Sequence, residues 1–136
     1  MGAAMSPFNA FMFIQGLETL ALRIREHSKN ADEIAKFLMS HPKVERVSHP
    51  SVASDLAKER ADKYLSGGCG GLMGFEIKGG IEAGKQFINS LEMFYHVANI
   101  GDSRSLAIHP ASTTHSQLNE EELLSAGVTP GYVRLS

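Results

Sequence analysis

The chain has 136 residues, of which 43% are hydrophobic and 21% charged, so it holds enough apolar material for one folded domain and too little charge for an intrinsically disordered chain. Its formal charge of −2, without a basic block, a secretion signal or an apolar run of transmembrane length, argues against nucleic acid and membranes as partners. The single cysteine, Cys69, excludes an internal disulfide and suits the reducing cytoplasm, where we expect the protein.

A long helix is predicted at the start of the chain. Ser6 and Pro7 form a typical beginning, because serine caps free backbone N–H groups and proline is tolerated at the first helical position. Apolar residues then recur every three or four positions up to Met39, and the proline after His41 disfavours continuation. The first turns are apolar on nearly every side, which indicates burial against something outside this chain; the residues concerned are Phe8, Phe11, Met12, Phe13 and Ile14.

Shorter elements follow this helix. Apolar runs and alternating patterns predict strands at 44–47, 72–77, 97–100, 106–108 and 132–136. Helical spacing predicts helices at 56–65, 81–94 and 120–126, the last with the capping pair Asn119 and Glu122. Gly101 and Asp102 are the expected turn between two antiparallel strands. With the helices covering one face of the sheet, the predicted fold class is α+β with a mainly antiparallel sheet.

Three features that could form a catalytic or ligand-binding site are better explained by structural roles. The glycine run 67–71 lacks the Gly-Lys-Ser/Thr ending of a phosphate loop and precedes a strand, so we interpret it as a flexible turn. His109 and His115 lie six positions apart without a further ligand, so no metal site is predicted. Cys69 has no histidine base near it in sequence, which argues against a catalytic thiol.

Arg134 and Asn99 each leave two explanations open. Arg134 stands in a predicted strand, where its guanidinium needs either solvent or a planar anion such as a carboxylate, which it can bind through two parallel hydrogen bonds. From the residues alone, an outward-facing arginine is the more ordinary explanation. Asn99 could donate a side-chain hydrogen bond to a ligand, although asparagine near a turn usually bonds its own backbone.

Several segments together resemble the C-terminal domain of the Cys/Met-metabolism family of pyridoxal-phosphate (PLP) enzymes, which has the aspartate-aminotransferase type of fold. They cover almost the whole chain: GAAMSPFNAFMFIQGLETLALRIREHSKNA, HPKVERVSHP, YLSGGCGGLMGFEIKGG, HVANIGDSRSLAIHPASTTHSQL and GVTPGYVRLS. ANIGD with HPASTTH is more similar to the O-acetylhomoserine sulfhydrylases of the family than to its cystathionine synthases and lyases or its methionine γ-lyases. The stretch HPSVASDLAKERADKYL departs from the family by lacking a Pro-Gly-Leu motif.

The resemblance implies a reaction, a cofactor and a substrate site. The reaction joins O-acetylhomoserine to sulfide or a thiol and gives homocysteine or methionine plus acetate, with PLP as cofactor. The substrate-binding residues that it implies are Arg134 for the α-carboxylate of the amino-acid substrate, Asn99 assisting it, and Thr114 in the wall of the site. The rest of HPASTTH is expected to be structural, and the full-length enzyme to be a homo-oligomer.

The resemblance also implies that part of the enzyme lies elsewhere. In the family, the lysine that binds PLP and the other cofactor-binding residues precede the segment GAAMSP, and none of the lysines here has the family's Ser-x-x-Lys context. We therefore expect residues 1–40 to be a long interdomain helix and 41–136 a small α/β C-terminal domain, with no catalytic or cofactor-binding residue, inactive without an N-terminal PLP-binding domain. The alternatives are a stand-alone, non-catalytic binding module, or the C-terminal domain of another transsulfuration enzyme such as a cystathionine synthase or lyase or a methionine γ-lyase.

Overall fold

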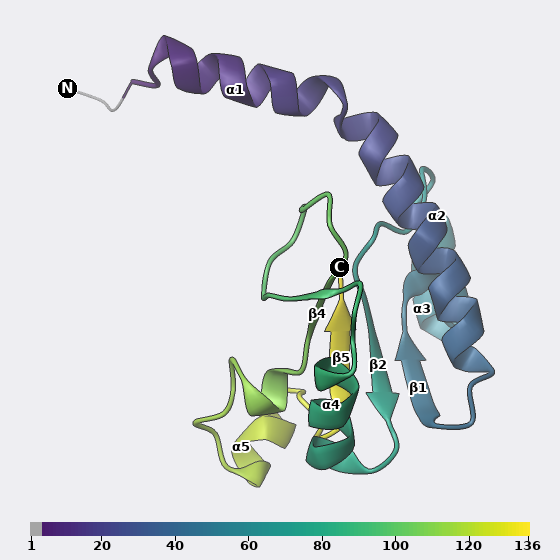
Figure 1. Ribbon diagram of the computed structural model, residues 1–136. Coiled ribbons are helices and arrows are strands. Elements are labelled where there is room, and N and C mark those ends of the chain that lie inside the picture. The colour runs from purple at the N-terminus through teal and green to yellow at the C-terminus, as the bar shows by residue number, and fades with distance from the viewer. Residues whose placement is uncertain (1–3) are drawn as a thin grey trace.

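Five strands form the sheet around which the described residues, 4–136, are arranged in the computed structural model (Figure 1). They are β1 (Val44–Ser48), β2 (Met73–Ile77), β3 (Tyr95–His96), β4 (Leu106–Ile108) and β5 (Tyr132–Leu135). In space their order is β1-β2-β5-β4-β3, and every neighbouring pair except β3 and β4 is antiparallel. The predicted α+β class with a mainly antiparallel sheet is confirmed.

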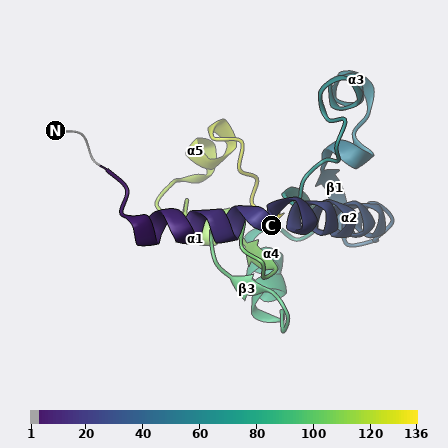
Figure 2. The same cartoon turned by 90° about the horizontal axis from the view of Figure 1, so that it is seen from above.

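Two helices precede the first strand, and the other helices lie in connections between strands. They are α1 (Pro7–Glu18), α2 (Leu20–Met39), α3 (Asp55–Tyr64), α4 (Gly80–Asn89) and α5 (Glu120–Ser125), with short 3-10 turns η1 (Pro50–Val52) and η2 (Pro110–Ser112). Seen from above, α3 and α4 lie on opposite sides of the sheet (Figure 2): α4 packs on the core and α3 borders the other face, so the prediction that the helices cover one face is wrong. Among residues 4–136, no helix is both long and apolar enough to cross a membrane.

The predicted long helix is interrupted at Thr19, whose φ of −104° and ψ of 1° leave the helical region. Gly16 and the β-branched Thr19 both have low helix propensity. The guanidinium of Arg23 donates to the carbonyl of Gly16 at 3.1 Å and to the hydroxyl of Thr19, so the groups released at the bend are still hydrogen-bonded. As a result α1 leads away from the sheet at an angle to α2 (Figure 1), and none of its residues is buried.

The hydrophobic core lies between one face of the sheet and the helices α2 and α4. Its buried residues are Ala35, Leu38, Met73, Phe75, Ile88, Ala107, Val133 and Leu135. The rings of Phe75 and Phe87 meet edge to face with their centroids 5.4 Å apart. The buried face of α2 carries Ala31, Ala35 and Leu38, whereas Ile24 and Ile34, which share the apolar spacing of this helix, remain exposed.

One predicted strand is absent, and one predicted helix ends earlier than expected. Residues 97–100 are not a strand: β3 ends at His96 and pairs with β4 in parallel, so Gly101 and Asp102 lie in a loop and not in a hairpin turn. The exposed side chains of Val97 and Ile100 produced the apolar pattern there. The helix expected over 81–94 stops at Asn89, because Ser90 caps it by donating to the carbonyl of Phe87 at 2.8 Å.

Candidate functional site

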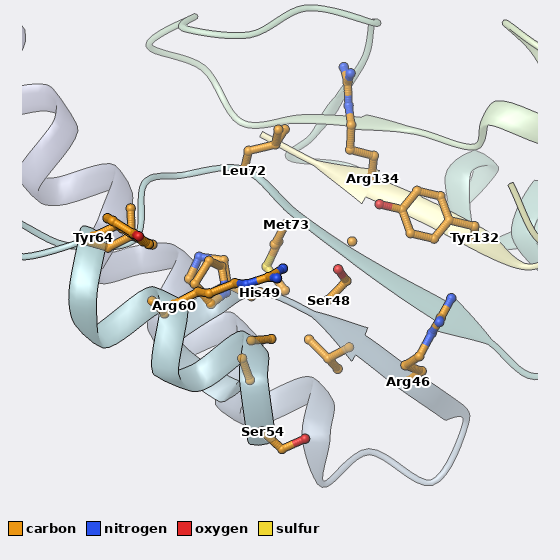
Figure 3. A pocket seen from close by; sticks show the side chains of 17 residues that line it. Arg46, Ser48, His49, Ser54, Arg60, Tyr64, Leu72, Met73, Tyr132 and Arg134 are labelled. Atoms are coloured by element: carbon orange, nitrogen blue, oxygen red, sulfur yellow. The ribbon is translucent and has the colours of Figure 1, made fainter. Parts of the chain in front are cut away.

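The sheet face opposite the core borders an open groove. The register aligns one row of residues across β1, β2 and β5, made of Ser48, Gly74 and Arg134. This face and α3 together enclose a groove of about 740 Å³ (Figure 3). Arg46, Arg60 and Arg134 line the groove, and none of the described residues that line it is acidic. A groove with this charge favours an anionic ligand.

Gly74 lets an aromatic side chain lie flat across the groove floor. A Cβ atom at Gly74 would overlap the ring and hydroxyl of Tyr132, which stands two residues before Arg134 on the neighbouring strand. In Figure 3 the hydroxyl of Tyr132 is directed toward the middle of the groove, whereas the guanidinium of Arg134 points away from the groove floor. The arginine therefore reaches toward the rim of the groove.

Arg134 meets the loop that follows β3. Its NH2 group donates to the backbone carbonyl of Asn99 at 3.1 Å, and Ser136 Oγ donates to the same carbonyl at 2.9 Å. Arg134 Nε is buried and has no hydrogen-bond partner among residues 4–136. Because a buried unpaired donor is costly, this N–H is suited to a ligand oxygen. The guanidinium is thus anchored at one corner and still has donors to offer.

Of the three predicted substrate-binding residues, the structure brings two together. Asn99 contacts Arg134, but through its backbone carbonyl; its side-chain oxygen accepts from the backbone N–H of Ile100 at 2.9 Å, as is usual for asparagine near a turn. Thr114 is exposed, pairs with Nδ1 of His115 at 2.9 Å, and is not among the residues that line the groove. Its assignment stays a prediction.

The two motif segments near the C-terminal end of the chain meet at a buried histidine. His109 is 0% exposed, and its Nε2 lies 2.8 Å from the carbonyl of Pro130 while its Nδ1 lies 2.8 Å from Ser112 Oγ. Because a carbonyl only accepts, Nε2 carries the hydrogen and Nδ1 accepts from the serine hydroxyl. The structural role expected for HPASTTH is borne out at this histidine, which ties η2 to the start of β5.

Glu76 also fixes the start of β5, and sequence analysis missed it. Its carboxylate accepts from the backbone N–H of Gly131 at 3.0 Å and from the hydroxyl of Thr129. Gly131 leaves no room for a side chain, because a Cβ atom there would overlap the carbonyl of Ile77. A glutamate in an alternating strand normally faces solvent, so the sequence carried no signal for this role.

The glycine run 67–71 forms the expected turn, and it is tied to α2. The N–H of Gly70 donates to Ser28 Oγ at 3.1 Å, and the carbonyl of Gly70 lies 3.4 Å from Nε2 of the buried His49. Gly68 and Gly70 adopt positive φ values of 115° and 78°, which glycine accepts without strain. The run therefore serves the packing of the domain.

Cys69 is held in its thiol form. Burial, followed by the negative charges of Asp32 and Asp62, raises the pKa of this thiol above its ordinary value of 9.0. We therefore predict that iodoacetamide alkylates Cys69 at pH 8 more slowly than it alkylates free cysteine, because the thiolate is the nucleophile. Mass spectrometry over time measures the rate. In urea the rate should approach that of free cysteine; a folded chain that reacts faster than free cysteine would contradict the prediction.

The described residues do not fit PLP as a covalent cofactor. All seven lysines are exposed, and none of them lines the groove beside Arg134. A lysine that attacks an aldehyde needs a lowered pKa, which burial or a neighbouring cation provides. Residues 4–136 also hold no group of three histidine, cysteine, aspartate or glutamate residues suited to a metal ion. What this domain offers is a cationic groove with an arginine at its rim.

Comparison with known proteins identifies the fold. A solved structure from Campylobacter jejuni, described as an O-acetylhomoserine (thiol)-lyase with N'-pyridoxyl-lysine-5'-monophosphate, superposes with a TM-score of 0.87 and 48% sequence identity. The superposition covers 99% of this chain and 32% of that one. The helix-covered, mainly antiparallel sheet is therefore the small domain of a PLP-dependent lyase fold.

Sequence comparison then gives the family. Residues 1–136 match the family described as Cys/Met metabolism PLP-dependent enzyme. The chain therefore belongs to this family. It is 56% identical to an O-acetyl-L-homoserine sulfhydrylase of Leptospira meyeri and 47% identical to O-acetyl-L-homoserine sulfhydrylase 1 of Thermus thermophilus. These matches cover 100% and 99% of this chain but 31% and 32% of the relatives. The chain spans about a third of the length of the curated relatives it matches.

Proposed function

We propose that this chain is the C-terminal domain of a cytoplasmic, PLP-dependent O-acetylhomoserine sulfhydrylase. The observation that carries the proposal is the 56% identity, over the whole chain, to a relative of that name. In the reaction, the sulfur of sulfide or a thiol bonds to the γ-carbon of O-acetylhomoserine while the bond from this carbon to the ester oxygen breaks. Acetate leaves, and homocysteine or methionine remains. When bound, PLP supplies the electron sink for this chemistry.

In the reaction, this domain binds and orients the amino-acid substrate. Arg134 grips the α-carboxylate, Asn99 assists it, and Thr114 belongs to the wall of the site. The unpartnered N–H of Arg134 Nε supports this role, since a planar carboxylate accepts two parallel hydrogen bonds from a guanidinium. The positive groove beside Arg134 favours the approach of an anionic group.

The apolar surface of α1 supports the proposed domain arrangement. Six large apolar side chains of this helix are more than half exposed: Phe8, Phe11, Met12, Phe13, Ile14 and Leu17. We keep the boundaries 1–40 for the interdomain segment and 41–136 for the small domain. Residues 1–3 lie outside the described part of the chain, and the rest of the segment consists mainly of α1 and α2, of which α2 packs on the small domain. In this arrangement α1 packs against the N-terminal PLP-binding domain, and the full-length enzyme is a homo-oligomer. A stand-alone binding module would leave this contiguous apolar surface in water, which is unusual for a soluble monomer.

Two assays test the proposal. The full-length enzyme should form homocysteine from O-acetylhomoserine and sulfide, and the 136-residue chain alone should not. The isolated chain, incubated with PLP and reduced with borohydride, should show no stoichiometric adduct at one lysine by intact mass spectrometry. A full-length enzyme that cleaves methionine but does not form homocysteine would overturn the sulfhydrylase assignment. A single defined lysine adduct would overturn the conclusion that the cofactor site lies elsewhere.

A further inference from the structure

Residues 97–105 form the loop between β3 and β4, and this loop places the carbonyl of Asn99 next to the guanidinium of Arg134. The backbone N–H of Tyr95 donates to the carbonyl of Ser105 at 2.9 Å, which closes the base of the loop. Near its middle, Gly101 adopts a φ of 85°, which few other residues tolerate. The loop residues 97–101 are exposed, so core packing does not determine their conformation.

An ion pair inside this loop holds its conformation in the absence of core packing. The carboxylate of Asp102 accepts three hydrogen bonds from Arg104: from the backbone N–H at 2.9 Å, from Nε at 3.1 Å and from NH2 at 2.8 Å. The guanidinium of Arg104 also lies over the ring of Tyr95, 4.6 Å from its centroid. Asp102 is thereby fixed to the strand end at Tyr95.

Both the geometry and the charge state of the Asp102–Arg104 pair are suited to holding the loop in one conformation. A two-pronged arginine–carboxylate contact defines orientation as well as distance. The hydrogen bonds from Arg104 lower the pKa of Asp102 from 3.8 to about 2, so the carboxylate remains ionised at any pH near neutrality. Neither residue lines the arginine-rich groove, so the pair acts on that groove only through the loop.

We propose that Asp102 is a positioning residue for substrate binding: through its bidentate contact with Arg104 it fixes the loop whose Asn99 carbonyl anchors one corner of the Arg134 guanidinium. The inference deepens the proposed function and rests on it, because it requires Arg134 to bind the substrate carboxylate. With the loop fixed, the remaining donors of Arg134 face the ligand in a single orientation. Without the Asp102–Arg104 pair, the guanidinium samples other rotamers, and the substrate must select the competent one.

Asp102→Asn in the full-length enzyme tests the proposal. We expect the KM for O-acetylhomoserine to rise about three- to tenfold, the factor for one hydrogen bond of ordinary strength, with kcat within about twofold of the parent. The dissociation constant of butyrate, an unreactive carboxylate, should rise by a similar factor in ligand-observed NMR. The KM for sulfide and the melting temperature should not change. Arg104→Ala, which removes the other partner, should reproduce this pattern.

Two further variants separate the possible explanations. Asp62→Asn makes the same chemical change in the exposed pair with Lys58 and should leave every constant unchanged. In an Arg134→Ala background, Asp102→Asn should have no additional effect on KM, because the residue that it positions is gone. If the full effect persists there, or kcat and the melting temperature fall with it, the loop is merely structural and the proposal is overturned.

The same variants separate the positioning role of Asp102 from the carboxylate-binding role of Arg134. If Arg134→Ala raises KM and Asp102→Asn does not, only the positioning role fails. If Arg134→Ala itself leaves the KM and the butyrate dissociation constant unchanged, the carboxylate-binding function of Arg134 fails, and the role of Asp102 falls with it.

Discussion

Replacing Arg134 by alanine in the full-length enzyme should raise the KM for O-acetylhomoserine sharply. Loss of a bidentate, charge-assisted contact costs roughly 2–5 kcal/mol, a factor of about 30 to several thousand in kcat/KM. In the proposed site this contact would hold a carboxylate that does not react, so binding should lose more than the chemical step. Initial rates across a range of substrate concentrations measure both constants.

Two other variants make this result specific. Arg134→Lys keeps the positive charge but loses the planar fork, so it should restore only part of the affinity. Arg46→Ala removes an exposed arginine that lines the same groove and should change KM by much less, because solvent screens its charge. If Arg134→Ala leaves KM unchanged, or if Arg46→Ala has an equal effect, Arg134 is not the carboxylate ligand.

Sequence patterns correctly predicted the elements that depend on contacts between residues close together in the chain. Asn119 accepts from the backbone N–H groups of Glu121 and Glu122 at 3.0 Å, and Glu122 accepts from the N–H of Asn119 at 2.8 Å, so the expected capping box forms. Ser6 likewise caps α1 by accepting from Asn9 at 3.3 Å. Such contacts span a few residues, and their spacing is visible in the sequence.

The errors and omissions have non-local causes. The apolar spacing of Leu91 and Phe94 suggested a longer helix, but both residues pack against the core from the segment after α4. Glu76 is separated from Thr129 and Gly131 by more than fifty positions, and no pattern in the sequence marks that pairing. The family resemblance, and not the residue pattern, singled out Arg134 for the carboxylate, and only the fold shows that a backbone carbonyl anchors its guanidinium.

His109 ties η2 to the segment before β5, the strand that carries Arg134, and Gly84 offers a test of its packing. A Cβ atom at Gly84, in α4, would overlap the imidazole of His109. The ring cannot move aside without losing its hydrogen bonds to Pro130 and Ser112. We therefore expect Gly84→Ala to lower the free energy of unfolding of the 136-residue chain by about 2–4 kcal/mol, measured by urea denaturation.

Helix propensity predicts the opposite sign, which makes the result decisive. Alanine in place of a helical glycine ordinarily stabilises by up to about 1 kcal/mol, and Gly16→Ala in α1, where nothing lies within 4 Å of the new atom, should show this gain. His109→Ala alone should destabilise the chain, because the carbonyl of Pro130 loses its donor. In that background Gly84→Ala should become neutral or stabilising, since the ring that it would strike is absent. If Gly84→Ala instead stabilises the parent chain as Gly16→Ala does, the ring of His109 is free to move, and its two hydrogen bonds do not hold η2 against the start of β5.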